Sequence, residues 1–190
     1  DITHNIAAYN LLQTAYIVRN AYKFFPEGSI HIVAVDSFYH KNRKNILAKI
    51  DGHYFICADN GITNLMFFDI KPEAIYEITL NNRFDDKVIF PATEIFVPAA
   101  MHLYKGGLPE VIGRKIKSIK DVSFPRAIYN ENEKMIVGEV MYVDNFGNVV
   151  SNISRKFFDK YASVSEKYTV KFRNIVVSKI LDQYTDIVTD

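Results

Sequence analysis

The stretch Ile30-His31-Ile32-Val33-Ala34-Val35-Asp36 decides the predicted fold of this chain. The run before Asp36 is mostly apolar and β-branched and is too short for a helix. It therefore predicts a strand that is buried on both faces, as in a parallel sheet. A charged residue just past the carboxyl end of such a strand lies where open α/β sheets bind their ligands. The stretch thus predicts an α/β domain and makes Asp36 a candidate site residue.

A helix is predicted on the amino side of this strand and a hairpin on its carboxyl side. Residues 11–25 place apolar side chains at helical spacing, and Pro26 ends the pattern. Residues 45–50 and 53–57 flank Asp51-Gly52. This arrangement predicts a β-hairpin, because glycine tolerates the positive φ angle that a tight type I′ turn requires.

Three more elements are expected in this part of the chain. The turn Asp59-Asn60-Gly61 leads into a short helix that ends at Phe68, and residues 74–80 predict a strand. Residues 93–104 predict a helix. Pro98 should bend this helix or delay its start, because proline cannot donate a backbone hydrogen bond.

The remainder of the chain has a different character. Residues 121–134 are polar, contain Pro125 and predict a linker. The strands expected beyond the linker are residues 135–143, 149–153, 168–172 and 175–180. The sequence therefore predicts an α/β domain over residues 1–120, a linker over 121–134 and a mostly β domain over 135–190.

Composition excludes several classes of protein. The net charge is +1, from 23 basic and 22 acidic residues, whereas a nucleic-acid surface requires a basic excess. The chain has 8 glycines and neither common nucleotide-binding glycine motif. No apolar run approaches the roughly 20 residues of a membrane helix. The chain has a single cysteine, Cys57, and five scattered histidines, and this set predicts no metal site. A single cysteine is also compatible with a cytoplasmic location.

Four short stretches then occur in a fixed order. They are Asp1-Ile2-Thr3-His4 followed by Tyr9; Phe25 to His31 running into Val35-Asp36, with Arg43 seven residues on; Asp59-Asn60-Gly61; and Gly138 to Asn148 followed by Asn152-Ile153. Together they resemble the S-adenosylmethionine hydroxide adenosyltransferase family, whose relatives include the fluorinase and chlorinase enzymes. The resemblance covers nearly the whole chain.

The resemblance implies an amino-terminal mixed α/β sandwich domain followed by a carboxy-terminal β-barrel domain. It implies a homotrimer that binds its substrate between the first domain of one subunit and the second domain of its neighbour. The implied reaction needs no cofactor: water attacks C5′ of S-adenosylmethionine and releases adenosine and methionine. The family also begins with a strand ending in Thr-Asp-Phe-Gly and ends with a Ser-aromatic-Gly stretch. We expect both segments to be missing from this sequence.

Asp36 and Arg43 match the family's catalytic positions. An Asp can accept a proton from the attacking water, and an Arg can fix that Asp and stabilise the developing hydroxide. A sulfonium is already a good leaving group, so no general acid is required. The plainer interpretation is that Asp36 caps a turn and that Arg43 is a solvated surface cation.

The resemblance also implies five substrate-binding residues, namely Tyr9, Phe90, Asp144, Phe146 and Asn148. Phe146 can stack on adenine, Asn148 can bond the edge of the base, and Asp144 can pair with the ammonium group of the methionine moiety. Tyr9 and Phe90 match aromatic positions that line the nucleoside pocket. The plainer interpretation makes residues 144–148 an ordinary hairpin turn and places the two aromatic rings in the core or at an interface.

The sequence departs from the family beside the presumed reacting centre. Pro91 takes the place of a family histidine, and Ser37-Phe38-Tyr39-His40 replaces a Pro-Gly-Val-Gly stretch. A nucleoside-binding protein that has lost catalysis is therefore the main alternative. A halogenase is a weaker alternative, because Ala92 carries no hydroxyl and Asp36 would repel a halide. A two-domain oligomer with an unrelated ligand also stays open.

Overall fold

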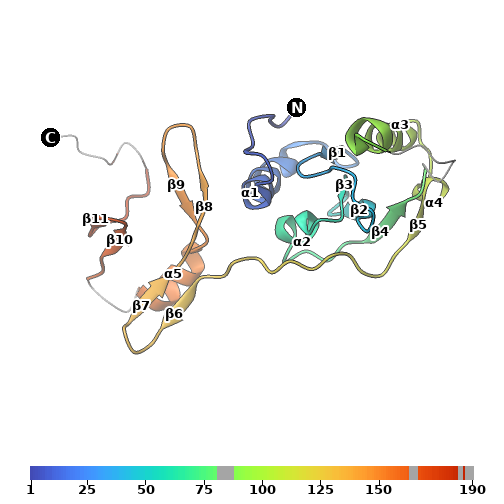
Figure 1. The fold of residues 1–190 in the computed structure, drawn as a ribbon. Coiled ribbons are helices and arrows are strands. Elements are labelled where there is room, and N and C mark those ends of the chain that lie inside the picture. Colours follow the sequence, from blue (N-terminus) through green and yellow to red (C-terminus); the bar gives the residue numbers. More distant parts are fainter. Residues whose placement is uncertain (81–87, 163–166, 184–185, 187–190) are drawn as a thin grey trace. The chain divides into compact units, whose positions relative to one another are not determined.

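The computed structural model describes residues 1–80, 88–162, 167–183 and 186 of the chain (Figure 1). The contacts divide the chain into two compact units. One unit contains Asp1–Phe124 and Met141–Val149, and the other contains Pro125–Val140 and Val150–Asp190. The predicted domain boundaries, at residues 120 and 135, remain a prediction.

A five-stranded mixed sheet organises the first unit. Its strands are β1 (Ile30–Val33), β2 (Asn45–Ile50), β3 (His53–Ala58), β4 (Ala74–Ile78) and β5 (Gly113–Lys115). They lie in the order β1-β3-β2-β4-β5, with β1 parallel to β3 and the other pairs antiparallel. The turn between β2 and β3 has φ angles of 50° at Asp51 and 75° at Gly52, which confirms the predicted hairpin.

Helices cover both faces of this sheet (Figure 1). On one face lie α1 (Leu11–Ala21), a 3₁₀ turn at Tyr22–Phe24 and α2 (Ile62–Met66); on the other lie a π-helical turn at Ala92–Phe96, α3 (Val97–Tyr104) and α4 (Pro109–Ile112). Each face of the sheet carries an apolar core, and alternate residues of β3 pack into the two cores. Phe55 and Cys57 pack under α1 and α2, while Ile56 and Ala58 pack under α3. The predicted α/β sandwich is confirmed.

The first strand differs from its prediction in one respect. It ends at Val33, and only one of its faces is fully buried: His31 and Val33 are buried, whereas Ile32 is 41% exposed. The expectation of burial on both faces was wrong. The reason is that β1 is an edge strand, and on its second face only Ile30 packs, partly buried, against the core beneath α3.

The helix around Pro98 follows its prediction with a local change. The start of the helix is not delayed. Instead, the turn before Pro98 is wider than an α-helical turn, because the N–H of Val97 donates to the carbonyl of Ala92, five residues back. At the other end, Gly106 has a φ of 83° and its N–H donates to Leu103, while Gly107 donates to His102. These two bonds form the Schellman motif that ends many helices at a glycine.

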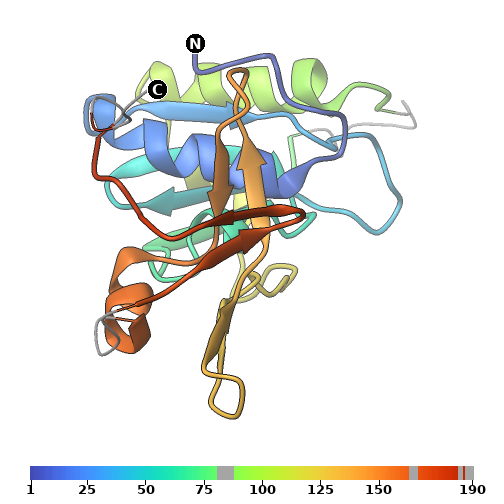
Figure 2. The same cartoon turned by 90° about the vertical axis from the view of Figure 1, so that its left-hand side faces the viewer.

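Three hairpins and one helix make up most of the described residues after position 125. The elements are β6 (Ile128–Asn130), β7 (Met135–Val137), β8 (Val140–Val143), β9 (Val149–Ser151), α5 (Arg155–Ala162), β10 (Val170–Phe172) and β11 (Ile175–Val177). Within the described residues the strands form separate two-stranded sheets, so the predicted closed barrel is not confirmed (Figure 2). The predicted linker 121–134 contains β6, which pairs with β7.

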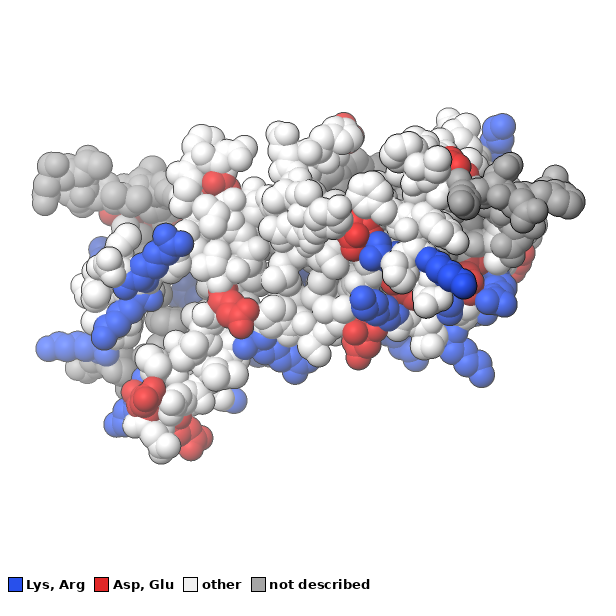
Figure 3. Space-filling model, viewed as in Figure 1, with Lys and Arg blue, Asp and Glu red and all other residues white. Residues whose placement is uncertain are grey.

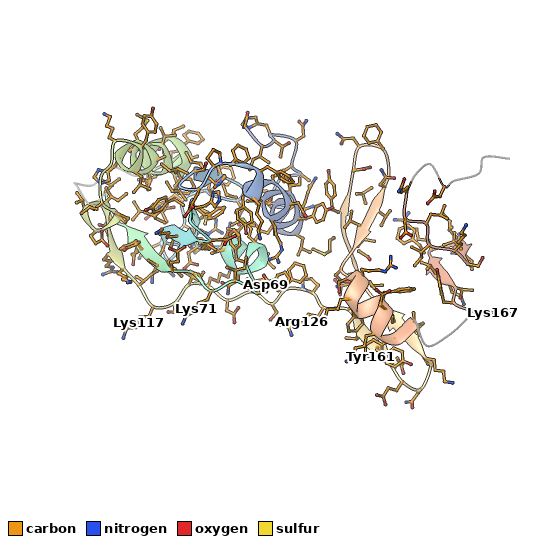
Figure 4. All side chains as sticks on the ribbon, turned by 180° about the vertical axis from the view of Figure 1, so that it is seen from behind. Asp69, Lys71, Lys117, Arg126, Tyr161 and Lys167 are labelled. Carbon is orange, nitrogen blue, oxygen red and sulfur yellow. The ribbon has the colours of Figure 1, made fainter. Side chains whose placement is uncertain are left out.

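The helix α5 was not predicted. Ser154 starts it, because its hydroxyl accepts a bond from Phe157 N–H and its carbonyl accepts one from Phe158 N–H. Tyr161 of this helix, labelled in Figure 4, stacks on Tyr129 of β6 with ring centroids 4.2 Å apart. The helix and the β6–β7 hairpin are thereby packed together within the second unit.

One ion pair joins α1 to the end of α2 and supports a stability prediction. Arg19 donates to both carboxylate oxygens of Asp69, at 2.8 and 2.7 Å, and to the carbonyl of Met66 at 2.8 Å (Asp69 is labelled in Figure 4). Its side chain is only 29% exposed. We expect Arg19→Ala to lower the free energy of unfolding by about 1 kcal/mol, since a two-pronged and partly buried pair is lost.

Chemical denaturation measures this effect. The control is Arg114→Ala, because the Arg114 side chain pairs with Glu77 but is 71% exposed. An exposed ion pair contributes little, so the control should lose less than about 0.5 kcal/mol. Equal losses in the two variants would contradict the importance of the α1–α2 pair.

Candidate functional site

The residue pair Asp36 and Arg43 lies in the loop that follows β1. Arg43 Nη1 donates to the Asp36 carboxylate at 3.1 Å and to the Asp36 carbonyl oxygen at 2.7 Å. Both side chains are about one-fifth exposed, 23% for Arg43 and 19% for Asp36. The second carboxylate oxygen of Asp36 accepts no hydrogen bond from any other residue that the structure describes. One oxygen is thus fixed by the cation, and the other can accept a proton from water.

The backbone around Asp36 is held in an unusual conformation. Asp36 has a φ of 49°, in the left-handed region that non-glycine residues seldom occupy. The buried side chain of Asn60 donates from Nδ2 to the carbonyls of Val35 and Asp36, at 3.2 and 3.1 Å. The loop is closed further along, where Arg43 N–H donates to the carbonyl of His40. The Asp36 carboxylate therefore starts from a constrained backbone.

Tyr9 lies beside the same loop. Its ring centroid is 6.2 Å from that of Phe38, and the two rings are 63% and 56% exposed. Tyr39 is also exposed, at 60%. Two exposed rings, at positions 38 and 39, thus lie close in sequence to Asp36, and the Tyr9 ring lies beside the first of them.

The other implied pocket aromatic, Phe90, lies before the π-helical turn. Its ring is 60% exposed, and its N–H donates to Glu94 Oε1 at 2.6 Å. Pro91, which takes the place of the family's histidine, is the residue directly before this turn. A proline side chain carries no donor or acceptor, so position 91 contributes no imidazole.

The turn Asp144–Asn148 is closed by its own side chains. The Asp144 carboxylate accepts from the N–H groups of Phe146 and Asn148, at 2.9 and 2.8 Å, and from Asn148 Nδ2 at 2.7 Å. The Asn148 side-chain bond is the largest cause that holds the pKa of Asp144 below its usual value. Phe146, at the tip, is 92% exposed. Asp144 thus has a structural role in the turn, and Phe146 is presented to solvent.

Of the other reactive groups in the described part of the chain, Cys57 is inaccessible, whereas His40 lies in the same loop as Asp36 and Arg43. Cys57 is buried, and burial raises the pKa of its thiol to about 12. His40 is exposed, and its Nδ1 accepts from Asn42 N–H at 3.4 Å. No group of three or more His, Cys, Asp or Glu side chains that could hold a metal ion occurs among the described residues. No helix in the described ranges is long and apolar enough to cross a membrane.

One face of the surface carries charges of both signs. On the face that Figure 3 shows, acidic side chains are interspersed among the basic ones. A face on which both signs are mixed does not attract a polyanion strongly.

The structure brings some of the predicted residues together and leaves others apart. Asp36 contacts Arg43, and Asp144 contacts Asn148. Tyr9 contacts Phe38, a residue that was noted only as a departure from the family. Asn60 was quoted in a motif but received no role; its position before a glycine, between a strand and a helix, was the available signal. The catalytic and binding roles remain predictions.

Family models match most of the chain. A model described as the SAM hydroxide adenosyltransferase N-terminal domain matches residues 1–113. A model described as the C-terminal domain of the same family matches residues 138–189. These ranges contain all the predicted site residues.

Two curated relatives carry the description "(R)-S-adenosyl-L-methionine hydrolase". The protein from Methanocaldococcus jannaschii is 23% identical over 183 residues, which cover 95% of this chain and 59% of the relative. The protein from Thermus thermophilus is 25% identical over 164 residues, which cover 82% of this chain and 62% of the relative. The chain thus spans about three-fifths of the length of these relatives.

Solved structures show the same fold. An uncharacterized conserved protein from Thermotoga maritima is 27% identical, with a TM-score of 0.85 over 100% of this chain and 73% of that chain. A conserved hypothetical protein from Thermus thermophilus is 22% identical, with a TM-score of 0.62 over 80% of this chain and 63% of that chain. The second likeness concerns the fold alone.

Proposed function

Because this chain belongs to the SAM hydroxide adenosyltransferase family, we propose that the protein hydrolyses S-adenosylmethionine at C5′ to adenosine and methionine. The observation that carries the proposal is the contact between Asp36 and Arg43 at the carboxyl end of β1. The descriptions of the curated relatives support the same class of substrate. No cofactor is proposed, since the sulfonium is itself the activated group.

In the proposed step, Asp36 orients a water molecule in line with the C5′–S bond. The water oxygen attacks C5′ as the C5′–S bond breaks, and the bonding electron pair goes to sulfur, which becomes the neutral thioether of methionine. The water proton passes to the free oxygen of the Asp36 carboxylate and from there to solvent. Arg43 holds the other oxygen and stabilises the hydroxide character that develops on the water.

The proposed binding contacts follow from the exposed aromatic rings and the closed turn. Phe146, at the tip of the turn, is available to stack on adenine. Asn148 uses its Nδ2 on Asp144, so its Oδ1 is left to accept a bond from the adenine amino group. Tyr9 and Phe90 are proposed to line the nucleoside pocket, and Asp144 is proposed to meet the ammonium group of the methionine moiety. A homotrimer and a cytoplasmic location complete the proposal.

One observation favours a second candidate function. Pro91 supplies no imidazole where the family has a histidine, which removes one polar group of the family's site. A trimeric protein that binds S-adenosylmethionine or adenosine without turnover is therefore the alternative. The two candidates differ in their products, so one experiment separates them.

The test is chromatography of S-adenosylmethionine incubated with the full-length protein. The (R) and (S) epimers at sulfur are assayed separately, because the descriptions of the relatives specify the (R) form. We expect adenosine and methionine in equal amounts from at least one epimer. Unchanged substrate, with binding confirmed by calorimetry, would establish the second candidate, and a 5′-halo-adenosine formed with added halide would indicate a halogenase.

A further inference from the structure

The side chain of Asn60 connects the loop of Asp36 to the start of α2. Nδ2 donates to the carbonyls of Val35 and Asp36, and Oδ1 accepts from Ile62 N–H at 3.1 Å. Asn60 is only 3% exposed, so water does not compete for these bonds. All three bonds go to the backbone, which means that Asn60 determines where the chain runs on either side.

The backbone of Asn60 is itself fixed by its two neighbours. Asp59 N–H donates to the carbonyl of Lys44 at 2.8 Å, and Asp59 Oδ1 accepts from Lys120 N–H at 2.7 Å. Gly61 has a φ of 99°, and a side chain at this position would collide with Val122. Residues 59–61 thus form a rigid support from which the Asn60 amide reaches the Asp36 loop.

Asn60 and Arg43 share one acceptor. The carbonyl oxygen of Asp36 accepts from Asn60 Nδ2 at 3.1 Å and from Arg43 Nη1 at 2.7 Å. The same Arg43 nitrogen bonds the Asp36 carboxylate. If the carbonyl moves, the guanidinium loses one of its two contacts, and the carboxylate loses its fixed orientation.

We infer that Asn60 is a positioning residue that holds the Asp36 carboxylate and Arg43 in the orientation needed for attack by water. The inference rests on the proposed function. Asn60 does not meet the substrate in this scheme; it stabilises the left-handed backbone of Asp36 through two hydrogen bonds. A carboxylate that is misplaced by even a fraction of an ångström orients water poorly, which lowers the rate of the chemical step rather than binding.

The two ends of the Asn60 amide can be tested separately. In Asn60→Ser, the hydroxyl oxygen can still accept from Ile62 N–H, as in a serine turn, but nothing reaches Val35 and Asp36. The matched control is Asn64→Ser in α2, because Asn64 also donates from its side chain, to Asp121 Oδ1 at 2.8 Å, but does not touch the loop. Thermal unfolding of each variant reports any purely structural effect.

The experiment measures kcat and KM for S-adenosylmethionine with the full-length protein, Asn60→Ser, Asp36→Asn and the double variant. We expect Asn60→Ser to lower kcat about 10- to 100-fold with KM within about 3-fold. In the Asp36→Asn background the same change should lower kcat less than about 2-fold, because Asn60 acts through Asp36. The control variant, Asn64→Ser, should have the same kcat as the unchanged protein.

Several results would overturn the inference. They are an unchanged kcat in Asn60→Ser, an effect on KM alone, or an equal loss of kcat in the presence and absence of Asp36. If Asn60→Ser does not fold, Asn60→Asp takes its place, since it has the same shape and keeps an acceptor while the donor is lost. Failure of the proposed function is a different result: the unchanged protein releases no adenosine, or Asp36→Asn is as active as the unchanged protein.

Discussion

An Asp36→Asn variant is expected to release adenosine from S-adenosylmethionine at least about 100-fold more slowly than the unchanged protein, because an amide cannot take up the proton of the attacking water. The amide still fits the loop and still offers an oxygen to Arg43, which lies 3.1 Å from Oδ1. The loss should therefore appear in kcat and leave binding of adenosine nearly unchanged. Single-turnover assays and calorimetry on the full-length protein measure the two quantities.

A substitution of Arg43, which bonds Asp36, should lower the rate by a smaller factor. Arg43→Lys keeps the positive charge but replaces the guanidinium, whose Nη1 donates to both the carbonyl and the carboxylate of Asp36, with an ammonium group on a shorter side chain. We expect kcat to fall about 10-fold or more, since the developing hydroxide is less well stabilised. Lys41→Ala, in the same exposed loop, should leave kcat unchanged.

Asp69→Asn is the control for a general loss of stability. This substitution weakens the ion pair between α1 and α2 without changing the loop after β1. It should lower the unfolding midpoint and keep the rate of adenosine release. If Asp69→Asn and Asp36→Asn reduced activity equally, the assignment of Asp36 as the residue that activates water would be wrong.

The sequence was sufficient to predict the layers of the first unit. Apolar spacing in residues 11–25, the Asp51-Gly52 turn and the β-branched run from Ile30 all report local preferences that tertiary packing reinforces. The burial of β1 could not be read in the same way. An apolar strand at the edge of a sheet has the same composition as a central strand, and only the strand order shows that Ile32 is exposed.

The carboxy-terminal part was harder to predict for a physical reason. Its strands have three or four residues each, and short two-stranded hairpins depend on packing against other elements more than on local sequence. The helix α5 has mostly polar residues on its exposed side, and its start at Ser154 is a weak signal by itself. The barrel was expected only from the resemblance, and the described residues do not confirm it.

The candidate site shows the same division. A charged residue after a buried strand pointed to Asp36 from the sequence alone, whereas Arg43 entered through the resemblance. The hydrogen bonds of Asn60 join residues 24 and 25 positions apart, so they depend on how β3 places its carboxyl end beside that of β1. No local pattern contains that information.

A buried histidine pair should make the stability of the protein depend on pH. His31 Nε2 and His53 Nδ1 lie 3.2 Å apart, and the His31 ring stacks on Phe55 at 4.9 Å. Burial, with a smaller contribution from the nearby His53, lowers the pKa of His31 from 6.5 to about 4. The neutral ring is the form that fits this site, because a charged imidazole would be desolvated among aromatic rings.

The direction of the pH effect follows from the two pKa values of His31. Its pKa is lower in the folded state than in the unfolded state, so the unfolded chain binds more protons between about pH 4 and pH 6.5. The stabilising contribution is complete above the unfolded pKa and is lost as the pH falls towards the folded pKa. We expect the free energy of unfolding to fall by about 1 to 2 kcal/mol between about pH 7 and pH 5.

Urea denaturation at a series of pH values tests this expectation, and a matched pair of variants assigns it. His31→Gln keeps a polar group near the position of Nε2 but does not titrate, so its stability should change much less over the same range. His4→Gln replaces an exposed histidine and should keep the pH dependence of the unchanged protein. The window lies above the usual pKa of Asp and Glu, which keeps carboxylate protonation out of the comparison. If the free energy of unfolding of His31→Gln depended on pH as strongly as that of the unchanged protein, His31 would not be the group responsible.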